Sequence, residues 1–335
     1  MAQLQGPTTT EQSYAFSAVV PAAGSSLRMG AELRKPLLLL DTIPILLHTL
    51  WRLRCAAGCA EIALAVHPED VGFYTPERRE VLLAEFSVKA IVPGGQSRQE
   101  SVLTALEATS TSVPLALIHD AVRPLVKVDL MERVAARAAE CGAALAAVPA
   151  VPTIKDVAPD GHVVRTVPRQ TLWVAQTPQA FRRELILEAH HRARREGFVA
   201  TDDASLVERT GYPVMVVEDC CENLKITTPA DLAVAEAILR WQKDRDVRGA
   251  RVSATAFAPQ ERLGGLHRHV RAPHIPVLLP AQDGLGDGQV GRCGNLEVLA
   301  AVLHHHDGIA RMLHQRRVVC GDEAFPARPV VRLQD

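Results

Sequence analysis

Short apolar runs alternate with longer amphipathic stretches along the first two thirds of the chain. Apolar runs of strand length cover residues 16–21, 61–68, 88–95, 114–121 and 143–150. Stretches of helical period lie between them, at 43–58, 76–86, 97–108 and 128–142. This recurrence of strand, loop and helix predicts an α/β fold of the Rossmann-like kind, with a mostly parallel sheet.

The pattern changes between Pro149 and Pro178, where prolines are frequent. β-Branched residues flank an Asp-Gly pair at 160–161, which is typical of a tight hairpin turn. We therefore expect a β-arm over about 149–178 that projects from the body. An arm of this kind often packs against a second subunit, so a homodimer is predicted. Helix, strand and helix are then predicted at 182–196, 213–218 and 229–242.

The alternation ends near Asp246. Residues 247–335 are rich in proline, glycine, arginine and histidine, with one helical stretch at 295–314. We expect a frayed N-terminus over 1–15, one main domain over 16–242, and an extension of unknown role over 247–335 that is poorly ordered or a small added unit. The three adjacent histidines at 304–306 cannot all face one ion from a single helix, so we interpret them as a solvated face.

Composition narrows the class of protein. The 335 residues are 47% hydrophobic, enough for a sizeable core, and the formal net charge of -1 gives no reason to expect a nucleic-acid polymer as partner. The longest apolar stretch near the start, 36–40, is far shorter than the roughly 20 residues of a membrane helix, and the first 14 residues lack the pattern of a signal peptide. A cytoplasmic protein is predicted. The 7 cysteines lack paired zinc spacing and are interpreted as free thiols.

The stretch after the first predicted strand is rich in small residues. Ala22, Ala23 and Gly24 would let backbone N–H groups converge on a polyphosphate, and Arg28 and Lys35 could neutralise its charge. The stretch lacks the G-K-[ST] ending of a P-loop and the third glycine of the dinucleotide fingerprint. Taken alone, it fits a phosphate-binding loop and a purely structural turn equally well.

Two further predicted strand ends carry polar groups. Gly94 and Gly95 follow one strand, close to Ser101, whose hydroxyl could reach a base or sugar. Asp120 and Arg123 follow the next, and an aspartate there suits a ribose hydroxyl or a Mg²⁺ ion carried by phosphates. Each feature alone also fits an ordinary turn or helix cap. Because ligands bind at the carboxyl ends of parallel strands, their succession favours a nucleotide site.

Six motifs in collinear order carry a family resemblance: "VVPAAGSSLRMG", "GGQSRQESV", "HDAVRP", "VPRQTLWVAQTPQAF", "TDDASLVE" and "ENLKITTPADL". Over about residues 16–242 the chain resembles the 2-C-methyl-D-erythritol 4-phosphate cytidylyltransferases of the non-mevalonate isoprenoid pathway. The resemblance implies a fold of the nucleotide-diphospho-sugar transferase type. It also implies transfer of CMP from CTP to methylerythritol phosphate, with release of pyrophosphate and with Mg²⁺.

The resemblance assigns roles to residues of this chain. It implies that Arg28 and Lys35 stabilise the transition state and that Arg169 and Lys225 position the acceptor phosphate. The substrate-binding positions that it implies are Ala22, Ala23, Gly24, Gly95, Gln96, Ser101, Asp120, Arg123, Thr153 and Thr177. Asp120 is also its candidate Mg²⁺ ligand, with the ion held mainly by the CTP phosphates. Without the resemblance, Arg169 and Lys225 would be interpreted as solvated surface charges.

Three positions depart from the family pattern. Ser26 replaces a usual glycine, Gln96 replaces a frequent acidic residue, and Val122 replaces a common alanine. Serine is small enough to keep the backbone approach at the first position. The second change implies that cytosine recognition there depends on backbone groups.

Other functions remain open at this point. A ribitol 5-phosphate cytidylyltransferase would share the CTP half of the site and differ in the acceptor, and a non-catalytic nucleotide-binding protein could use the same fold. A molybdopterin-type nucleotidyltransferase is disfavoured by the arm motif and "HDAVRP". Some members of the family are fused to a cyclodiphosphate synthase with an Asp-x-His metal pair. Because no such pair occurs after residue 246, that second activity is not assigned.

Overall fold

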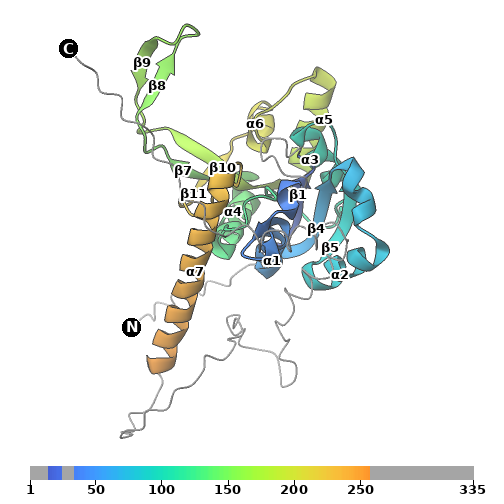
Figure 1. Ribbon diagram of the computed structural model, residues 1–335. Helices are drawn as coiled ribbons and strands as arrows, with labels where there is room; N and C mark the ends of the chain where they lie inside the picture. Colours follow the sequence, from blue (N-terminus) through green and yellow to red (C-terminus); the bar gives the residue numbers. More distant parts are fainter. Residues whose placement is uncertain (1–13, 25–33, 257–335) are drawn as a thin grey trace, which may run out of the picture. The chain divides into compact units, whose positions relative to one another are not determined.

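The computed structural model describes residues 14–24 and 34–256, with side chains described as far as Lys243. The predicted extension beyond 256, its helix and its histidines lie outside the described residues, as does the predicted frayed N-terminus up to residue 13. Figure 1 shows the described part as a central sheet with helices on both of its faces.

The central sheet has seven strands in the order β11-β7-β10-β6-β1-β4-β5. Its strands are β1 (Phe16–Ala22), β4 (Cys59–Val66), β5 (Val88–Pro93), β6 (Leu115–Ile118), β7 (Ala143–Pro149), β10 (Trp173–Arg182) and β11 (Met215–Glu218). β1 pairs in parallel with β4 and with β6, whereas β10 runs antiparallel to both β6 and β7. The α/β fold with a mainly parallel sheet is therefore confirmed.

Helices connect the strands. They are α1 (Ile45–Cys55), α2 (Pro76–Phe86), α3 (Arg98–Glu107), α4 (Val128–Cys141), α5 (Arg183–Glu196), α6 (Asp203–Glu208) and α7 (Pro229–Ala256), with two 3-10 turns, η2 (Lys35–Leu37) and η3 (Pro68–Phe73). The first helix begins later than predicted, because Ile43 and Pro44 form the short strand β3 (Ile43–Pro44) against β2 (Leu39–Leu40). The amphipathic pattern continues into that strand, so sequence alone did not separate the two.

The core lies where the helices cover the sheet. Val19, Leu106, Ile118 and Phe181 come from β1, α3, β6 and β10 and are fully buried together. Burying one such side chain stabilises the fold by about 1.5–3 kcal/mol. Gly142 ends α4 with a φ of 91°, a left-handed conformation that favours glycine, and this turn leads directly into β7.

The predicted arm contains a two-stranded hairpin, β8 (Ile154–Val157) and β9 (Val163–Val167), with Gly161 in its turn at a φ of 91°. Figure 1 shows this hairpin standing away from the central sheet. The last part of the predicted arm belongs to the central sheet, because Trp173 pairs with Pro149 at the start of β10. Prolines and polar residues around this strand conceal its period.

Helix α7 is longer than predicted. It runs from Pro229 to Ala256 and therefore passes the predicted boundary near Asp246. The division of the chain into three parts stays a prediction. Among the described helices, none is long and apolar enough to cross a membrane.

Candidate functional site

A pocket of about 400 Å³ opens at the carboxyl ends of β1, β4, β5 and β6. These strands are neighbours and parallel, so the loops that follow them meet at one edge of the sheet. The predicted site residues that line this pocket are Ala22, Ala23, Gly24, Lys35, Gly95, Gln96, Ser101, Asp120 and Lys225. The structure therefore brings together most of the residues predicted for the nucleotide.

Gly94 and Gly95 form a turn, here called the glycine turn, that reaches the pocket at Gly95 and lies very close to neighbouring segments of the chain. A Cβ atom on Gly94 would lie 2.3 Å from Cβ of Ala23 and 2.8 Å from Oγ of Ser101, so this position requires glycine. The Ser101 hydroxyl donates to the carbonyl of Ser97 at 2.8 Å and accepts from the N–H of Gly95 at 3.1 Å. Ser101 is only 2% exposed, and in this structure its hydroxyl fixes the glycine turn.

Asp120 is the charged centre of the pocket. Its Oδ1 accepts from Nε of Arg98 at 3.0 Å, and its Oδ2 lies 2.9 Å from Nζ of Lys225 and 3.6 Å from Nε of Arg123. Burial by itself would raise the pKa of this carboxyl group, but the charges of Arg98 and Lys225 outweigh burial and hold the pKa well below its usual value. Asp120 is therefore an anion at neutral pH.

His119 lies beside Asp120 and is fully buried. Burial lowers the pKa of its imidazole to about 4, so the ring is neutral near pH 7. Its Nδ1 is 3.1 Å from Oγ1 of Thr177, and its Nε2 is 3.1 Å from the carbonyl oxygen of Arg123. The Thr177 hydroxyl also accepts from the N–H of Asp120 at 3.1 Å. His119 and Thr177 thus support the backbone that carries Asp120.

The loop that carries Lys225 is anchored to the same region. Asn223 is 1% exposed, and its side-chain amide donates to the carbonyl of Thr177 at 2.8 Å and to Oδ2 of Asp219 at 2.7 Å. Arg123 donates to the carbonyl of Asn223 at 2.7 Å. These contacts explain why a lysine on an irregular loop has a defined place at the pocket wall.

The remaining predicted residues lie elsewhere. Arg123 and Thr177 are buried behind the pocket, where they contact its lining. Thr153 and Arg169 are exposed on the arm, and Arg169 donates to the carbonyl of Val151. Arg28 lies outside the described residues, so its predicted role stays a prediction.

Two basic side chains of the pocket were missed by the sequence reasoning. His67 directly follows β4, and its Nδ1 accepts from the N–H of Glu69 at 3.3 Å. Arg98 opens α3 directly after the glycine turn. Each stands close beyond a strand or turn, so a search of the first residues after every strand and turn would have found both.

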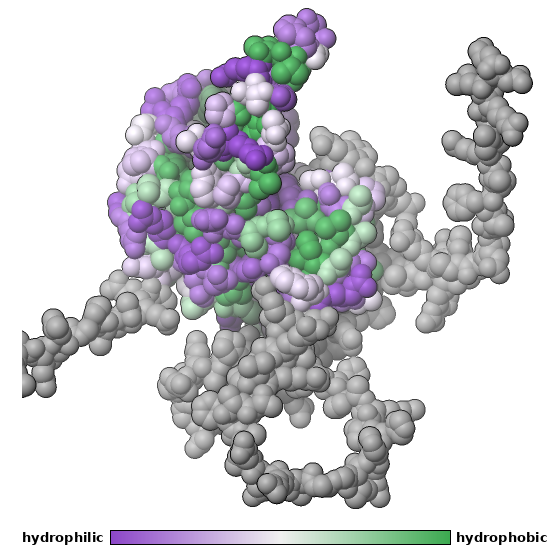
Figure 2. Space-filling model, turned by 90° about the vertical axis from the view of Figure 1, so that its left-hand side faces the viewer, coloured by the Kyte–Doolittle hydropathy of each residue, from purple (hydrophilic) through white to green (hydrophobic). Residues whose placement is uncertain are grey.

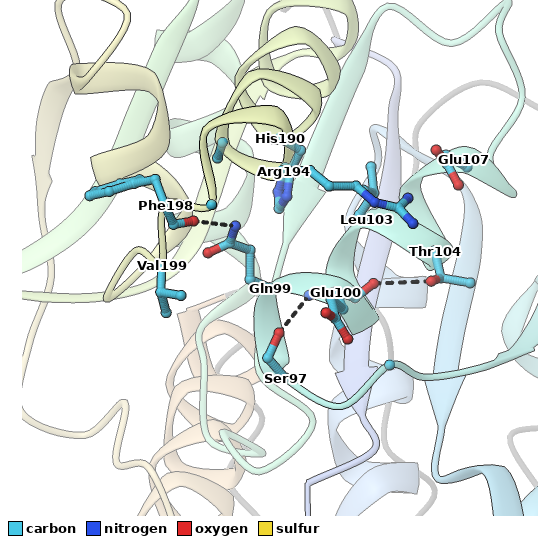
Figure 3. A pocket seen from close by; sticks show the side chains of 13 residues that line it. Ser97, Gln99, Glu100, Leu103, Thr104, Glu107, His190, Arg194, Phe198 and Val199 are labelled. Atoms are coloured by element: carbon cyan, nitrogen blue, oxygen red, sulfur yellow. Dashed lines mark hydrogen bonds between the residues drawn. The ribbon is translucent and has the colours of Figure 1, made fainter.

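A second cavity, of about 320 Å³, lies between α3 and α5. Figure 3 shows Gln99, Leu103 and Thr104 of α3 on one side and His190 and Arg194 of α5 on the other. This cavity shares only Gly95 and Ser97 with the strand-end pocket, and no predicted catalytic residue lines it.

The chemistry of the donor set bears on metal binding. Among the described residues, no three His, Cys, Asp or Glu side chains are grouped closely enough to hold a metal ion by themselves. Asp120 is the one carboxylate that lines the strand-end pocket within the described ranges. A single carboxylate suits a Mg²⁺ ion whose other ligands are substrate phosphates and water.

The chain is similar to proteins of one known family. A family model described as 2-C-methyl-D-erythritol 4-phosphate cytidylyltransferase matches residues 16–241. A relative of that name from Syntrophus aciditrophicus is 44% identical over 228 residues, which is 68% of this chain and 97% of the relative. A bifunctional enzyme IspD/IspF from Desulforudis audaxviator is 44% identical over 225 residues, covering 66% of this chain and 56% of that protein.

Solved structures agree. The crystal structure of 2-C-methyl-D-erythritol 4-phosphate cytidylyltransferase from Thermus thermophilus is 37% identical, with a TM-score of 0.57, over 68% of this chain and 99% of that one. The 4-diphosphocytidyl-2C-methyl-D-erythritol synthase from Anaerococcus prevotii is 28% identical, with a TM-score of 0.60, over 70% and 100%. The chain is thus a nucleotidyltransferase, and it belongs to the 2-C-methyl-D-erythritol 4-phosphate cytidylyltransferase family.

Proposed function

We propose that residues 16–242 transfer CMP from CTP to 2-C-methyl-D-erythritol 4-phosphate, giving 4-diphosphocytidyl-2-C-methyl-D-erythritol and pyrophosphate for isoprenoid synthesis. Family membership supports the reaction. The observation that carries it in this chain is the strand-end pocket, which is lined by Lys35, Lys225, Asp120 and the small residues Ala23, Gly24 and Gly95.

The chemistry suits this pocket. A phosphate oxygen of the acceptor attacks the α-phosphorus of CTP, a new P–O bond forms, and the bond to pyrophosphate breaks. The nucleophile is already an anion, so no general base is required. The site must instead offset repulsion between anions and the charge that grows on the α-phosphoryl group and the leaving pyrophosphate. Lys35 and Lys225 supply fixed positive charge, whereas the buried His119 is neutral and serves as support.

Each part of CTP has a proposed partner. The backbone of Ala22, Ala23 and Gly24 binds the phosphates, together with Arg28 from the segment outside the described residues. Gly95 and Gln96 bind cytosine, with Ser101 holding their turn in shape. Asp120 accepts a ribose hydroxyl hydrogen bond.

Mg²⁺ is part of the proposal. Asp120 is the residue that would hold it, alongside the CTP phosphates, because its carboxylate is ionised and lines the pocket. When bound, Mg²⁺ neutralises phosphate charge and polarises the α-phosphoryl group. Arg98 and Lys225 form ion pairs with the Asp120 carboxylate and thereby orient it.

The acceptor half rests on the arm. We propose that Thr153 and Arg169 meet methylerythritol phosphate opposite Lys225, and that the arm packs against a second copy of the chain in a homodimer. Figure 2 shows apolar surface on the projecting hairpin at the top of the view. Val163 and Val164 there are 54% and 57% exposed, so each face of the hairpin presents a valine that is available to a partner surface. A cytoplasmic location belongs to the same proposal.

The arm proposal has its own test. Sedimentation velocity should give a dimer for the full chain, and Val164→Lys should shift it towards monomer because a charge would be buried in the interface. Thr166→Lys places a charge two residues further along the same strand, so it should weaken the dimer in the same way. A monomeric wild-type chain with full activity would contradict the dimer.

Product formation tests the reaction. With CTP, Mg²⁺ and methylerythritol phosphate, we expect release of pyrophosphate and a cytidylylated product seen by mass spectrometry. Turnover with ribitol 5-phosphate only would assign the other acceptor. Tight CTP binding without turnover on either acceptor would show a nucleotide-binding protein that is not an enzyme.

A further inference from the structure

The motif "TDDAS" has no part in the function proposed above, although its second aspartate is deeply buried. Asp202 is the N-cap of α6, and its side chain accepts from the N–H of Ser205. Asp203 is the first residue of α6 and is 1% exposed. Because a buried carboxylate is costly unless it is paired, the partners of Asp203 indicate its role.

Arg98 joins Asp203 to the pocket. Its Nη1 donates to Oδ2 of Asp203 at 2.8 Å, while its Nε donates to Oδ1 of Asp120 at 3.0 Å. One planar guanidinium therefore bridges a carboxylate inside the pocket and a carboxylate outside it. Two bonds in different directions leave Arg98 a single orientation, which a bond to Asp120 alone would not impose.

Charge balance supports the same role. Asp120 faces three cations, Arg98, Arg123 and Lys225, and has one negative charge to share among them. Asp203 supplies a second negative charge to Arg98. Burial would raise the pKa of Asp203, but Arg98 and His190 together outweigh burial and hold that pKa below its usual value, so Asp203 is ionised. Asp120 is thereby left with more of its charge for Lys225 and for ligand.

The chain of contacts continues to α5. Nε2 of His190 lies 3.4 Å from Oδ1 of Asp203, and His190 is 1% exposed. His190 also lines the cavity between α3 and α5, as Figure 3 shows. The Asp203 carboxylate is therefore buried, with Arg98 and His190 as its neighbours.

We infer that Asp203 is a positioning residue of the cytidylyltransferase reaction: it holds Arg98, and Arg98 in turn fixes the Asp120 carboxylate where CTP binds. This inference rests on the proposed function. Asp203 does not itself line the pocket, so it acts through Arg98 and touches no substrate. The acidic motif at the start of α6 thus connects a helix outside the pocket to the nucleotide.

The first test compares two adjacent carboxylates. Asp203→Asn removes the charge that anchors Arg98. We expect the Kd for Mg²⁺-CTP to rise about tenfold, because groups that orient a metal-binding residue contribute about that much to affinity. Asp202→Asn also removes a carboxylate from α6, but asparagine is an equally good N-cap and Asp202 does not contact Arg98. We expect its Kd to stay within about twofold of wild type.

Calorimetry gives the CTP affinity without turnover, and thermal unfolding gives the stability of each variant. Equal Kd values for Asp203→Asn and Asp202→Asn would overturn the inference. If Asp203→Asn does not fold, Arg98→Lys keeps the positive charge but cannot make both bonds, and it should show the same loss of CTP affinity. A wild-type affinity for Arg98→Lys would overturn the inference equally.

The second test is a double-mutant cycle with Arg98→Lys and Asp203→Asn. If Asp203 acts through Arg98, the double variant should bind CTP about as weakly as Arg98→Lys alone. Losses that multiply would show independent, structural roles. Wild-type protein that binds CTP but transfers no CMP would count against the proposed function, whereas active wild-type protein with multiplying losses would count against this inference only.

Discussion

The strand-end pocket and the β8–β9 arm carry the two halves of the proposed site in opposite ways. In the pocket, Asp120 is 5% exposed and its carboxylate is bound by arginine and lysine side chains. On the arm, Arg169 and Thr153 are exposed in the segments that flank the β8–β9 hairpin, outside the central sheet. The nucleotide half is assembled by one chain, while the acceptor half presents its groups to the outside.

This contrast indicates how specificity can be divided. A buried, ion-paired pocket is held in place by the core of the domain, so it suits the substrate common to many nucleotidyltransferases. Residues of an exposed arm can be substituted at little cost to folding, so the arm suits recognition of the acceptor. We therefore expect pocket substitutions to affect chemistry and CTP binding, and arm substitutions to affect the acceptor.

The largest expected effect is on the pocket side. Lys35→Ala should lower kcat about 10²–10³-fold, because the transition state loses a fixed positive charge. Pyrophosphate release under saturating CTP and acceptor measures this. Lys243→Ala is the control, since that lysine is 56% exposed on α7 and pairs with Asp41 away from the pocket. A rate for Lys35→Ala close to that of the control would remove Lys35 from the mechanism.

The next effect concerns the arm. Arg169→Ala should raise the KM for methylerythritol phosphate about 10- to 100-fold, because an acceptor phosphate loses a charged hydrogen bond, while the Kd for CTP stays unchanged. Arg165→Ala is the matched control: Arg165 lies on the same arm, in β9, is 65% exposed, and pairs with Asp156 at 3.0 Å. If Arg169→Ala weakens CTP and the acceptor alike, the two regions do not divide the substrates as described.

A moderate effect should appear in stability against pH. The buried His119 has a pKa of about 4 in the folded protein, against about 6.5 when unfolded, so between these values the unfolded state binds more protons. The free energy of unfolding should therefore fall as pH drops from 6.5 to 4, by roughly 3 kcal/mol at most.

Urea denaturation at pH 7, 5.5 and 4.5 measures that loss. His119→Gln should give a flatter dependence over this window, because glutamine does not titrate. His162→Gln, which replaces an exposed histidine of the arm, is the control. An unchanged slope for His119→Gln would mean that acid acts through other groups.

The smallest effect is expected from the chain beyond α7. A chain that ends at Ala256, the last residue of α7, should keep kcat and both KM values within about twofold, because the pocket is built from residues before that point. Truncation at residue 246 would cut through the helix and is a less suitable experiment. Loss of turnover in the chain ending at Ala256 would show that the extension serves the reaction.

Much of the fold could be predicted from hydrophobic periodicity. Helix α2 lies at the predicted residues 76–86, and β1 extends the predicted strand by one residue, to Ala22. Strand β10 was not predicted, because polar and proline residues around Thr177 break its period and because its partner strands are distant in sequence. Local pattern identifies an element well only when one face of it is uniformly apolar.

The candidate site was predicted in a similar way. Gly95 and Asp120 were found because each follows a strand, a position that parallel sheets use for ligands. Arg98 was missed, since an arginine at the start of a helix is ordinary until its two partners are known. One of those partners, Asp203, is 105 residues away along the chain.

Local sequence was sufficient for the alternation of strands and helices, the small residues of the first loop and the family to which the chain belongs, because these depend on local period and on residues in fixed order. The three-dimensional fold was needed to establish that Arg98 bridges Asp120 and Asp203, that His119 is buried and neutral, and that the pocket and the arm differ in exposure. Burial and ion pairing depend on distances between residues remote in sequence, and folding alone brings those residues together.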